Sequence, residues 1–165
     1  MDDHVERLRG QWARELPDLD TSAMSVLGRA YRLSNLVRPS IEATFASFGL
    51  DRGEFDVIST LRRSGPPYKL TPTELYKSLM ISSGGLTHRL ARLEKAGLVA
   101  REKSEQDGRS FLVALTGEGQ RRAEEAFRAD MADEMRFLER LPLDKRAVLA
   151  ALLKELLSAI ETAED

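Results

Sequence analysis

The segment LTPTEL at residues 70–75 opens the stretch from Leu70 to Leu115 that decides the fold of this chain. The hydroxyl of Thr71 can cap a helix, Pro72 suits the first helical position, and Glu74 is spaced to complete a capping box. These residues therefore predict a helix that begins at Pro72.

A second helix is predicted from Ser83 to Ala96, after a tight turn in which Ser82 provides a new cap. Gly97 is expected to end this helix, because glycine tolerates the left-handed conformation at a helix terminus. The leucines of this helix should form a buried stripe, and five other residues should form the opposite, outer face: Leu86, Leu90 and Leu93 inside; Gly84, His88, Ala91, Arg92 and Lys95 outside. This outer face suits the major groove of DNA.

Gly84 and Gly85 fall in the predicted first turn of this second helix. Each glycine should cost about 1 kcal/mol of helix stability relative to alanine. Close approach of the backbone to a partner would account for that cost, and a merely loose helix start is the alternative.

Two runs of alternating residues follow, at 99–103 and 111–115, and predict a pair of antiparallel strands. The connecting segment SEQDGRS, residues 104–110, contains an Asp-Gly pair, which is a strong turn signal. The tip of this hairpin would present Arg109, which can enter a minor groove or bind phosphate, unless it is simply a solvated loop arginine. Two helices followed by a charged hairpin predict a winged helix-turn-helix, a module that binds duplex DNA.

The distribution of charge supports this prediction better than the total does, since the formal net charge of the chain is −2 and its pI is about 5.8. Residues 1–53 carry 7 basic and 8 acidic side chains, residues 54–110 carry 10 and 7, and residues 118–165 carry 8 and 12. Positive charge is therefore in excess where the winged helix is predicted, as contact with phosphates requires.

Four segments of the chain are the most specific for a family: LTPTEL at 70–75, LTHRLARLEKAGLV at 86–99, DGRS at 107–110 and LTGEG at 115–119. On these segments the chain resembles the multiple-antibiotic-resistance regulators, or MarR family, and the resemblance covers nearly its whole length. These proteins are dimeric bacterial winged-helix transcription factors. The resemblance implies that the helix from Ser83 to Ala96 enters the major groove, that Arg109 reaches the minor groove and that Asp107 orients the wing.

A catalytic function is not indicated. His88 is a better candidate for a DNA contact than for a catalytic base, because no carboxylate stands at a motif spacing from it. The sequence contains no phosphate-binding loop, dinucleotide-binding turn or zinc-protease helix motif, so we expect a regulator with no cofactor and no metal. Seven residues are expected to serve DNA binding: Ser83, Gly84, Thr87 and His88 near base edges or adjacent phosphates, Arg92 at a phosphate, and Asp107 and Arg109 in the wing.

Outside the winged helix the chain is predicted to be helical. A stripe of apolar residues spans 22–48, where Pro39 should kink or break the helix. A capping box at 51–54 should start a short helix. A long helix should follow Thr116, and a leucine-rich helix should occupy residues 143–160.

These helices carry more apolar surface than one subunit can bury, so about half of it is assigned to a symmetric dimer interface. The predicted fold is mainly α with a small β-wing, a winged helix-turn-helix that dimerises through its N- and C-terminal helices. We predict one domain over residues 1–165, divided as follows: an extra N-terminal helix at 1–20, dimerisation helices at 21–50 and 117–165, and a DNA-binding region at 51–115.

Composition restricts the compartment and the chemistry. No segment is long and apolar enough to span a bilayer and no leader-like start is present, so a cytoplasmic protein is expected. The chain has no cysteine, which excludes disulfides, thiolate zinc sites and switches based on thiol oxidation.

Four residues suggest a ligand site. Arg89 lies on the inner flank of the second predicted helix, where a guanidinium needs an acceptor. Asp56 is a candidate for that acceptor, and Arg101 adds a second cation, which leaves a positive excess suited to an anion. Trp12, the only tryptophan, lies in a segment at 11–20 that looks like an additional helix and offers a stacking face and one N–H donor.

This set resembles the urate-responsive branch of the MarR family, in which a tryptophan, an aspartate and two arginines bind a planar anionic purine that releases DNA. The resemblance assigns these roles to Trp12, Asp56, Arg89 and Arg101. An anion that competes for Arg89 would shift the recognition helix and spoil the fit to both half-sites of the DNA. An internal Arg–Asp network with Trp12 in the core is the alternative.

The predicted function is therefore that of a dimeric repressor that binds palindromic DNA and is released by a small aromatic anion such as urate. A different phenolic or purine ligand is one alternative, and a winged helix used to bind protein is another. Salt dependence separates the last alternative from DNA binding, because counterion release makes affinity for DNA fall steeply with salt.

Overall fold

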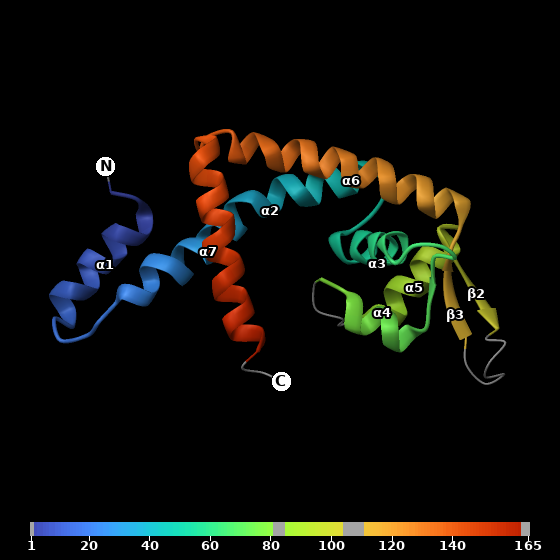
Figure 1. Cartoon of the computed structure of the whole chain (residues 1–165), viewed down its shortest axis with the longest axis horizontal. Helices are drawn as coiled ribbons and strands as arrows, with labels where there is room; N and C mark the ends of the chain where they lie inside the picture. Colours follow the sequence, from blue (N-terminus) through green and yellow to red (C-terminus); the bar gives the residue numbers. More distant parts are fainter. Residues whose placement is uncertain (1, 81–84, 104–110, 163–165) are drawn as a thin grey trace. The chain divides into compact units, whose positions relative to one another are not determined.

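A computed structural model describes residues 2–80, 85–103 and 111–162 of the chain (Figure 1). The chain forms two compact units, residues 1–42 and residues 43–165, and their boundary falls within one helix. The first unit contains α1 (His4–Glu15), the π-helical turn η1 (Met24–Gly28) and most of α2 (Arg29–Ser47). No helix in the described ranges is long and apolar enough to cross a membrane.

The second unit holds the predicted winged helix-turn-helix. It is mainly α-helical with a small sheet, which confirms the predicted fold class. Its elements after α2 are, in chain order, α3 (Arg52–Arg63), β1 (Lys69–Leu70), α4 (Pro72–Ser78), α5 (Leu86–Lys95), β2 (Val99–Lys103), β3 (Phe111–Leu115), α6 (Gly117–Leu138) and α7 (Leu143–Glu161).

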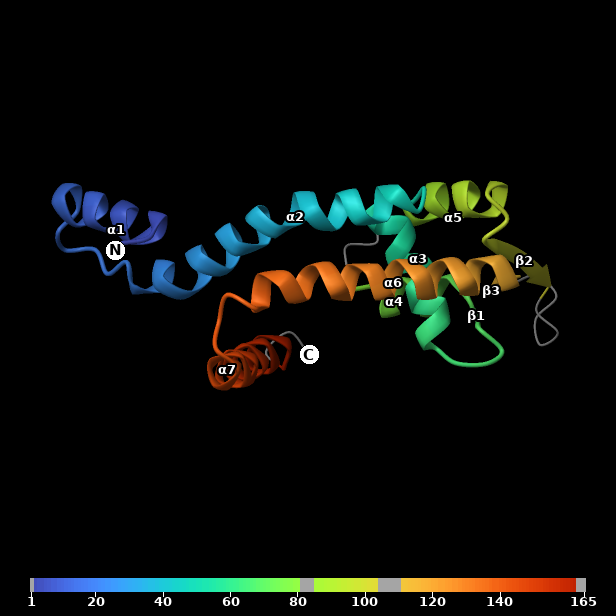
Figure 2. The same cartoon turned by 90° about the horizontal axis from the view of Figure 1, so that it is seen from above.

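Helix α3 is the centre of this unit. It contacts α4, α5, α6 and β3, and eight of its 12 residues are buried. The ring of Phe55 stacks on that of Phe45 with centroids 4.0 Å apart, while Ile58 and Leu61 are fully buried. Figure 2 shows α6 passing along α3 on its way from the sheet. Both helices of the helix-turn-helix and the last strand of the hairpin are therefore packed against this one helix.

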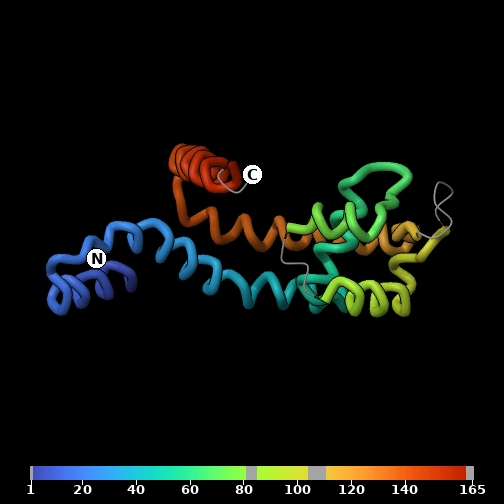
Figure 3. The backbone as a smooth tube through the Cα atoms, turned by 90° about the horizontal axis from the view of Figure 1, so that it is seen from below, coloured from blue at the N-terminus to red at the C-terminus, as the bar shows by residue number. Residues whose placement is uncertain are grey.

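The sheet has three antiparallel strands in the order β1-β3-β2, where the sequence predicted only the hairpin of β2 and β3. In β1, Lys69 pairs with Ala114 and Leu70 with Val113. Two residues carry no readable alternation, which is why the sequence pattern missed this strand. The loop at 64–68 between α3 and β1 projects from the unit (Figure 3).

The start of α4 is as predicted, but the start of α5 is not. Helix α4 begins at Pro72 with both capping-box hydrogen bonds formed. Helix α5 begins at Leu86 instead of Ser83, because Gly85 has a φ of 79° and so precedes the helix in a left-handed conformation. The predicted cap at Ser82 lies outside the described residues. At the other end Gly97, with a φ of 71°, ends α5 as expected.

Two predictions about the N-terminal helices are confirmed only in part. Helix α2 continues through Pro39, so a break there is wrong, while a kink at Pro39 stays a prediction. The additional helix predicted within residues 1–20 is present at His4–Glu15, so it covers only the first half of the segment 11–20. The carboxylate of Asp3 accepts the backbone N–H of Glu6 and caps this helix at its start.

The C-terminal helices form where the sequence places them. Thr116 caps α6 by accepting the backbone N–H of Gly119 at 3.0 Å, and α7 begins directly after Pro142. The apolar residues of α7 are left uncovered, with exposed fractions from 38% to 59%: Leu149, Leu152, Leu153, Leu156, Leu157 and Ile160.

Candidate nucleic-acid interface and ligand site

The outer face of α5 has the character that DNA recognition requires. Thr87, His88 and Lys95 are exposed, while Leu90 and Leu93 on the opposite side are buried. The leucine stripe therefore fixes which side chains face solvent. Four further predicted DNA-binding residues, Ser83, Gly84, Asp107 and Arg109, lie outside the described residues.

A groove of 490 Å³ lies between α4 and the start of α5, beside this outer face. Its lining includes Thr73 and Tyr76 from α4 and Thr87 from α5. Tyr76 is exposed, and its hydroxyl can donate to a phosphate. The sequence argument missed Tyr76, although its place directly after the buried Leu75 was the available signal.

Arg92, which was expected to contact a phosphate, forms ion pairs with two carboxylates at the start of α3. Its Nε lies 2.9 Å from Oε1 of Glu54, and its Nη1 lies 3.4 Å from Oδ2 of Asp51. These two carboxylates form the capping box of α3. The side chain of Arg92 is still 52% exposed, so the guanidinium is shared between the ion pairs and solvent.

Arg89 points toward α3, as its place on the inner flank of the helix predicts. A β-carbon placed on Gly53 would come within 2.5 Å of Cζ of Arg89, so the guanidinium lies directly against the first turn of α3. The absence of a side chain at Gly53 makes this approach possible.

Asp56 holds the turn of the helix-turn-helix. This buried carboxylate accepts the backbone N–H of Met80 at 3.2 Å, and its Oδ1 lies 3.9 Å from Nη1 of Arg63. Arg63 in turn donates to the carbonyl of Ser78. The sequence argument named Arg89 as the candidate partner of Asp56 and overlooked Arg63, which stands two helical turns along the same helix.

Arg101 connects the wing to the end of α5. Its Nε lies 3.3 Å from Oε2 of Glu94, and its Cζ lies 4.9 Å from the centroid of the Phe111 ring. Asp56 therefore contacts Met80 before α5, Arg89 belongs to α5 and lies against α3, and Arg101 belongs to the wing and contacts the end of α5.

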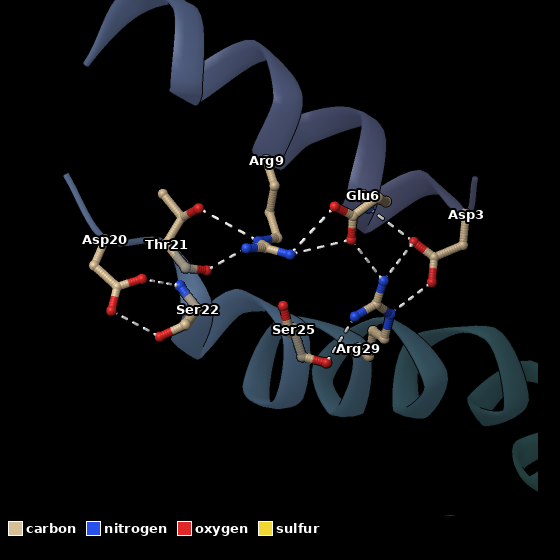
Figure 4. Close-up of polar contacts among 8 residues, drawn as sticks. All are labelled: Asp3, Glu6, Arg9, Asp20, Thr21, Ser22, Ser25 and Arg29. Atoms are coloured by element: carbon tan, nitrogen blue, oxygen red, sulfur yellow. Dashed lines mark hydrogen bonds and ion pairs between the residues drawn. The ribbon is translucent and has the colours of Figure 1, made fainter. Parts of the chain in front are cut away.

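Trp12, the fourth predicted ligand residue, lies on α1 in the first unit and is 47% exposed. A polar network fixes its helix to the segment that follows (Figure 4). Arg29 donates to Asp3 at 2.6 Å and to Glu6 at 3.0 Å, and Arg9 donates to the carbonyl of Thr21 at 3.2 Å. The hydrogen bond from Arg29 lowers the pKa of Asp3 to about 2.

The network in the first unit was not predicted, because its partners are up to 26 residues apart. Its only sequence signal is the spacing of Asp3 and Glu6, which places both carboxylates on one side of α1. Among the residues that the structure describes, no group of three His, Cys, Asp or Glu side chains could hold a metal ion.

Comparison with known proteins gives a consistent result. Residues 48–110 match the model of the MarR family. The HTH-type transcriptional regulator PecS of Dickeya dadantii (strain 3937) is 43% identical over 109 residues, which are 66% of this chain and 66% of that protein. The HTH-type transcriptional repressor Rv2887 of Mycobacterium tuberculosis (strain ATCC 25618 / H37Rv) is 30% identical over 126 residues, 76% of this chain and 88% of that protein. Reduced AbfR bound to DNA has a TM-score of 0.66 and 26% identity, over 87% of this chain and 94% of that one.

Proposed function

Because the chain belongs to the MarR family, we propose that it is a homodimeric repressor that binds palindromic DNA in the bacterial cytoplasm and is released by a small aromatic anion such as urate. The family consists of transcription regulators, so the chain is a regulator and not an enzyme. The observation that carries the DNA-binding proposal is the polar outer face of α5 above a buried leucine stripe.

DNA contact is assigned to the outer face of α5, the preceding turn and the wing. Thr87 and His88 are exposed on the first turn of α5, where they can reach base edges. Ser83 and Gly84 precede them, and Arg109 with Asp107 serves the wing. AbfR, a relative in fold and sequence, is bound to DNA in its solved structure, which supports the same use of this module.

The dimer proposal rests on uncovered apolar surface. The leucine face of α7 and neighbouring apolar residues of α6, such as Met131 and Leu138, are exposed in the isolated chain. Surface of this extent marks an interface rather than a solvated face. A twofold dimer would present two copies of α5 to successive turns of a duplex.

The ligand proposal keeps Trp12, Asp56, Arg89 and Arg101. Asp56 contacts Met80 before α5, Arg89 belongs to α5, and Arg101 belongs to the wing and contacts the end of α5. An anion that competes for these arginines would therefore change the position of the helix that reads DNA, which supplies the differential affinity that release requires.

The DNA-binding proposal is tested with a duplex selected by the wild-type protein from a random pool. Affinity should fall steeply between low and moderate salt, because phosphate contacts release counterions. Arg109→Ala should weaken binding to all duplexes, whereas Thr87→Ala and His88→Ala should change the preference among sequences. Binding that ignores salt would instead favour a protein-interaction module.

The ligand proposal is tested by titrating urate, xanthine and salicylate against the same protein–DNA complex. Urate should release the DNA and raise the melting temperature of the free protein. Asp56→Asn should abolish the response, and an unchanged response in that variant would refute the assignment. Release by salicylate alone would point to a phenolic ligand.

A further inference from the structure

Two arginines of α5 face the first turn of α3. Arg89 and Arg92 are three residues apart and are therefore neighbours on the surface of α5. Arg89 lies against Gly53, and Arg92 reaches Asp51 and Glu54. Both contacts fall on the first turn of α3, so α5 is attached to α3 at two points (Figure 1).

The electrostatics of this attachment need the two carboxylates. The N-terminus of a helix carries a partial positive charge, which disfavours nearby guanidinium groups. Asp51 and Glu54 reverse that preference. Glu54 uses both oxygens, since Oε2 accepts the backbone N–H of Asp51 at 2.8 Å and Oε1 lies 2.9 Å from Nε of Arg92.

Glu54 is only 3% exposed, and a buried charge without partners is strongly destabilising. Its capping hydrogen bond satisfies one oxygen, and Arg92 supplies the opposite charge. The pair therefore fixes the distance between the start of α3 and the middle of α5. This is a stricter constraint than apolar contacts provide, because hydrogen bonds are directional.

We propose that the capping box of α3 positions the recognition helix: Asp51 and Glu54 hold Arg92, Gly53 leaves room for Arg89, and the orientation of α5 toward DNA depends on both contacts. Arg92 is then a positioning residue for DNA binding. This inference rests on the DNA-binding function proposed above.

A direct phosphate contact by Arg92 predicts the opposite response to one substitution. Glu54→Gln keeps an oxygen that can accept the N–H of Asp51, since glutamine also completes capping boxes. It removes the charge that holds Arg92. If Arg92 contacted phosphate directly, the loss of a competing carboxylate would strengthen binding. If Arg92 positions α5, the same loss weakens specific binding.

The experiment measures affinity for the selected duplex and for poly(dI-dC) with wild type, Glu54→Gln and Glu74→Gln. Glu74→Gln is the matched control, because Glu74 completes the capping box of α4 with no arginine in its described hydrogen bonds. Glu54→Gln should lower specific affinity about tenfold. Affinity for poly(dI-dC) should stay within about twofold of wild type, which shows that the variant is folded and still attracts phosphates.

Arg92 variants give a second readout. Arg92→Lys keeps the charge and loses the planar fork of donors, so it should weaken specific binding like Arg92→Ala. The slope of log affinity against log salt should be unchanged in both. A slope reduced by about 0.9 per subunit in Arg92→Ala would identify a phosphate contact and overturn the inference.

The inference would also be overturned if Glu54→Gln bound the selected duplex as tightly as Glu74→Gln does, or more tightly. Failure of the proposed function is a separate result, because the wild-type protein would then show no salt-dependent affinity for any duplex.

Discussion

Two helices of the second unit, α3 and α4, begin with the same motif in different surroundings. In each, the backbone N–H of the capping residue donates to the glutamate three residues on, from Asp51 to Glu54 and from Thr71 to Glu74, both at 2.8 Å. Glu54 is buried and paired with Arg92, whereas Glu74 is exposed. The same local motif thus starts both helices, and only in α3 does it also bind another element.

The residue inside each box shows the same difference. Gly53 occupies the second helical position of α3, where Arg89 lies against it. Thr73 occupies the equivalent position of α4 and is exposed. The capping box therefore does not itself require glycine at its second helical position. In α3 the contact with Arg89 requires it.

The largest effect on the contact between α3 and α5 is expected from Gly53→Ala, which sharpens this contrast. The new methyl group would displace the guanidinium of Arg89, which is the far end of a flexible side chain, so the cost should lie at the low end of the usual range for overpacking, about 1 kcal/mol. Urea unfolding measures the loss, and the affinity for the selected duplex should fall with it.

Two control substitutions accompany this measurement. Thr73→Ala should change the free energy of unfolding by less than about 0.5 kcal/mol, since Thr73 is exposed. Gly117→Ala, at a helical glycine with open space around its Cα, should be neutral or stabilising. A Gly53→Ala protein as stable as Gly117→Ala would show that Arg89 is not held at this turn.

A second buried carboxylate, Asp130 on α6, provides the contrast to Glu54. It is 5% exposed, and its Oδ1 has no hydrogen-bond partner in the described part of the chain. Burial, together with the charges of Glu134 and Asp133, raises the pKa of Asp130 from 3.8 to about 6. Asp130→Asn should therefore stabilise the protein at pH 7 by about 1–2 kcal/mol, whereas Glu54→Gln should destabilise it.

The dependence on pH has a definite sign. Between the ordinary pKa of 3.8 and the raised pKa of about 6, the folded protein binds the proton of Asp130 more tightly than the unfolded chain does. Stability is therefore lost as the pH rises through this window. The advantage of Asp130→Asn, measured by urea unfolding, should be complete above pH 6 and vanish below about pH 4. A constant advantage at every pH would show that ionisation is not its cause.

The smallest effect is expected at Glu74. Hydrogen bonds from the backbone N–H and the hydroxyl of Thr71 lower the pKa of Glu74. Its contribution to stability is present above its ordinary pKa and is lost as the pH falls through the lowered value. The urea midpoints of wild type and Glu74→Gln should therefore differ slightly at neutral pH and converge in acid. A difference that grows on acidification would contradict this account.

Much of this fold was readable from local sequence signals. The capping boxes at Asp51 and Thr71, the stop at Gly97 and the cap at Thr116 all act within a few residues, so spacing alone reveals them. Strand β1 was not predicted, because its two residues give no periodic pattern.

The site was harder to predict, because its contacts join distant segments. A helical wheel places Arg92 on the outer side of α5, but the partner that decides its role, Glu54, is 38 residues away in sequence. The turn contact of Asp56 likewise spans 24 residues. Residue type and helical phase indicate which side chains point inward, and packing of the helices decides what they meet.

Amide hydrogen exchange of the free protein tests the central claim most directly, because it needs neither DNA nor ligand. Glu54→Gln should accelerate exchange along α5, Leu86–Lys95, while Glu74→Gln should accelerate it only in α4. Exchange in α5 that is identical in wild type and Glu54→Gln would contradict the claim that the capping box of α3 holds the recognition helix in place.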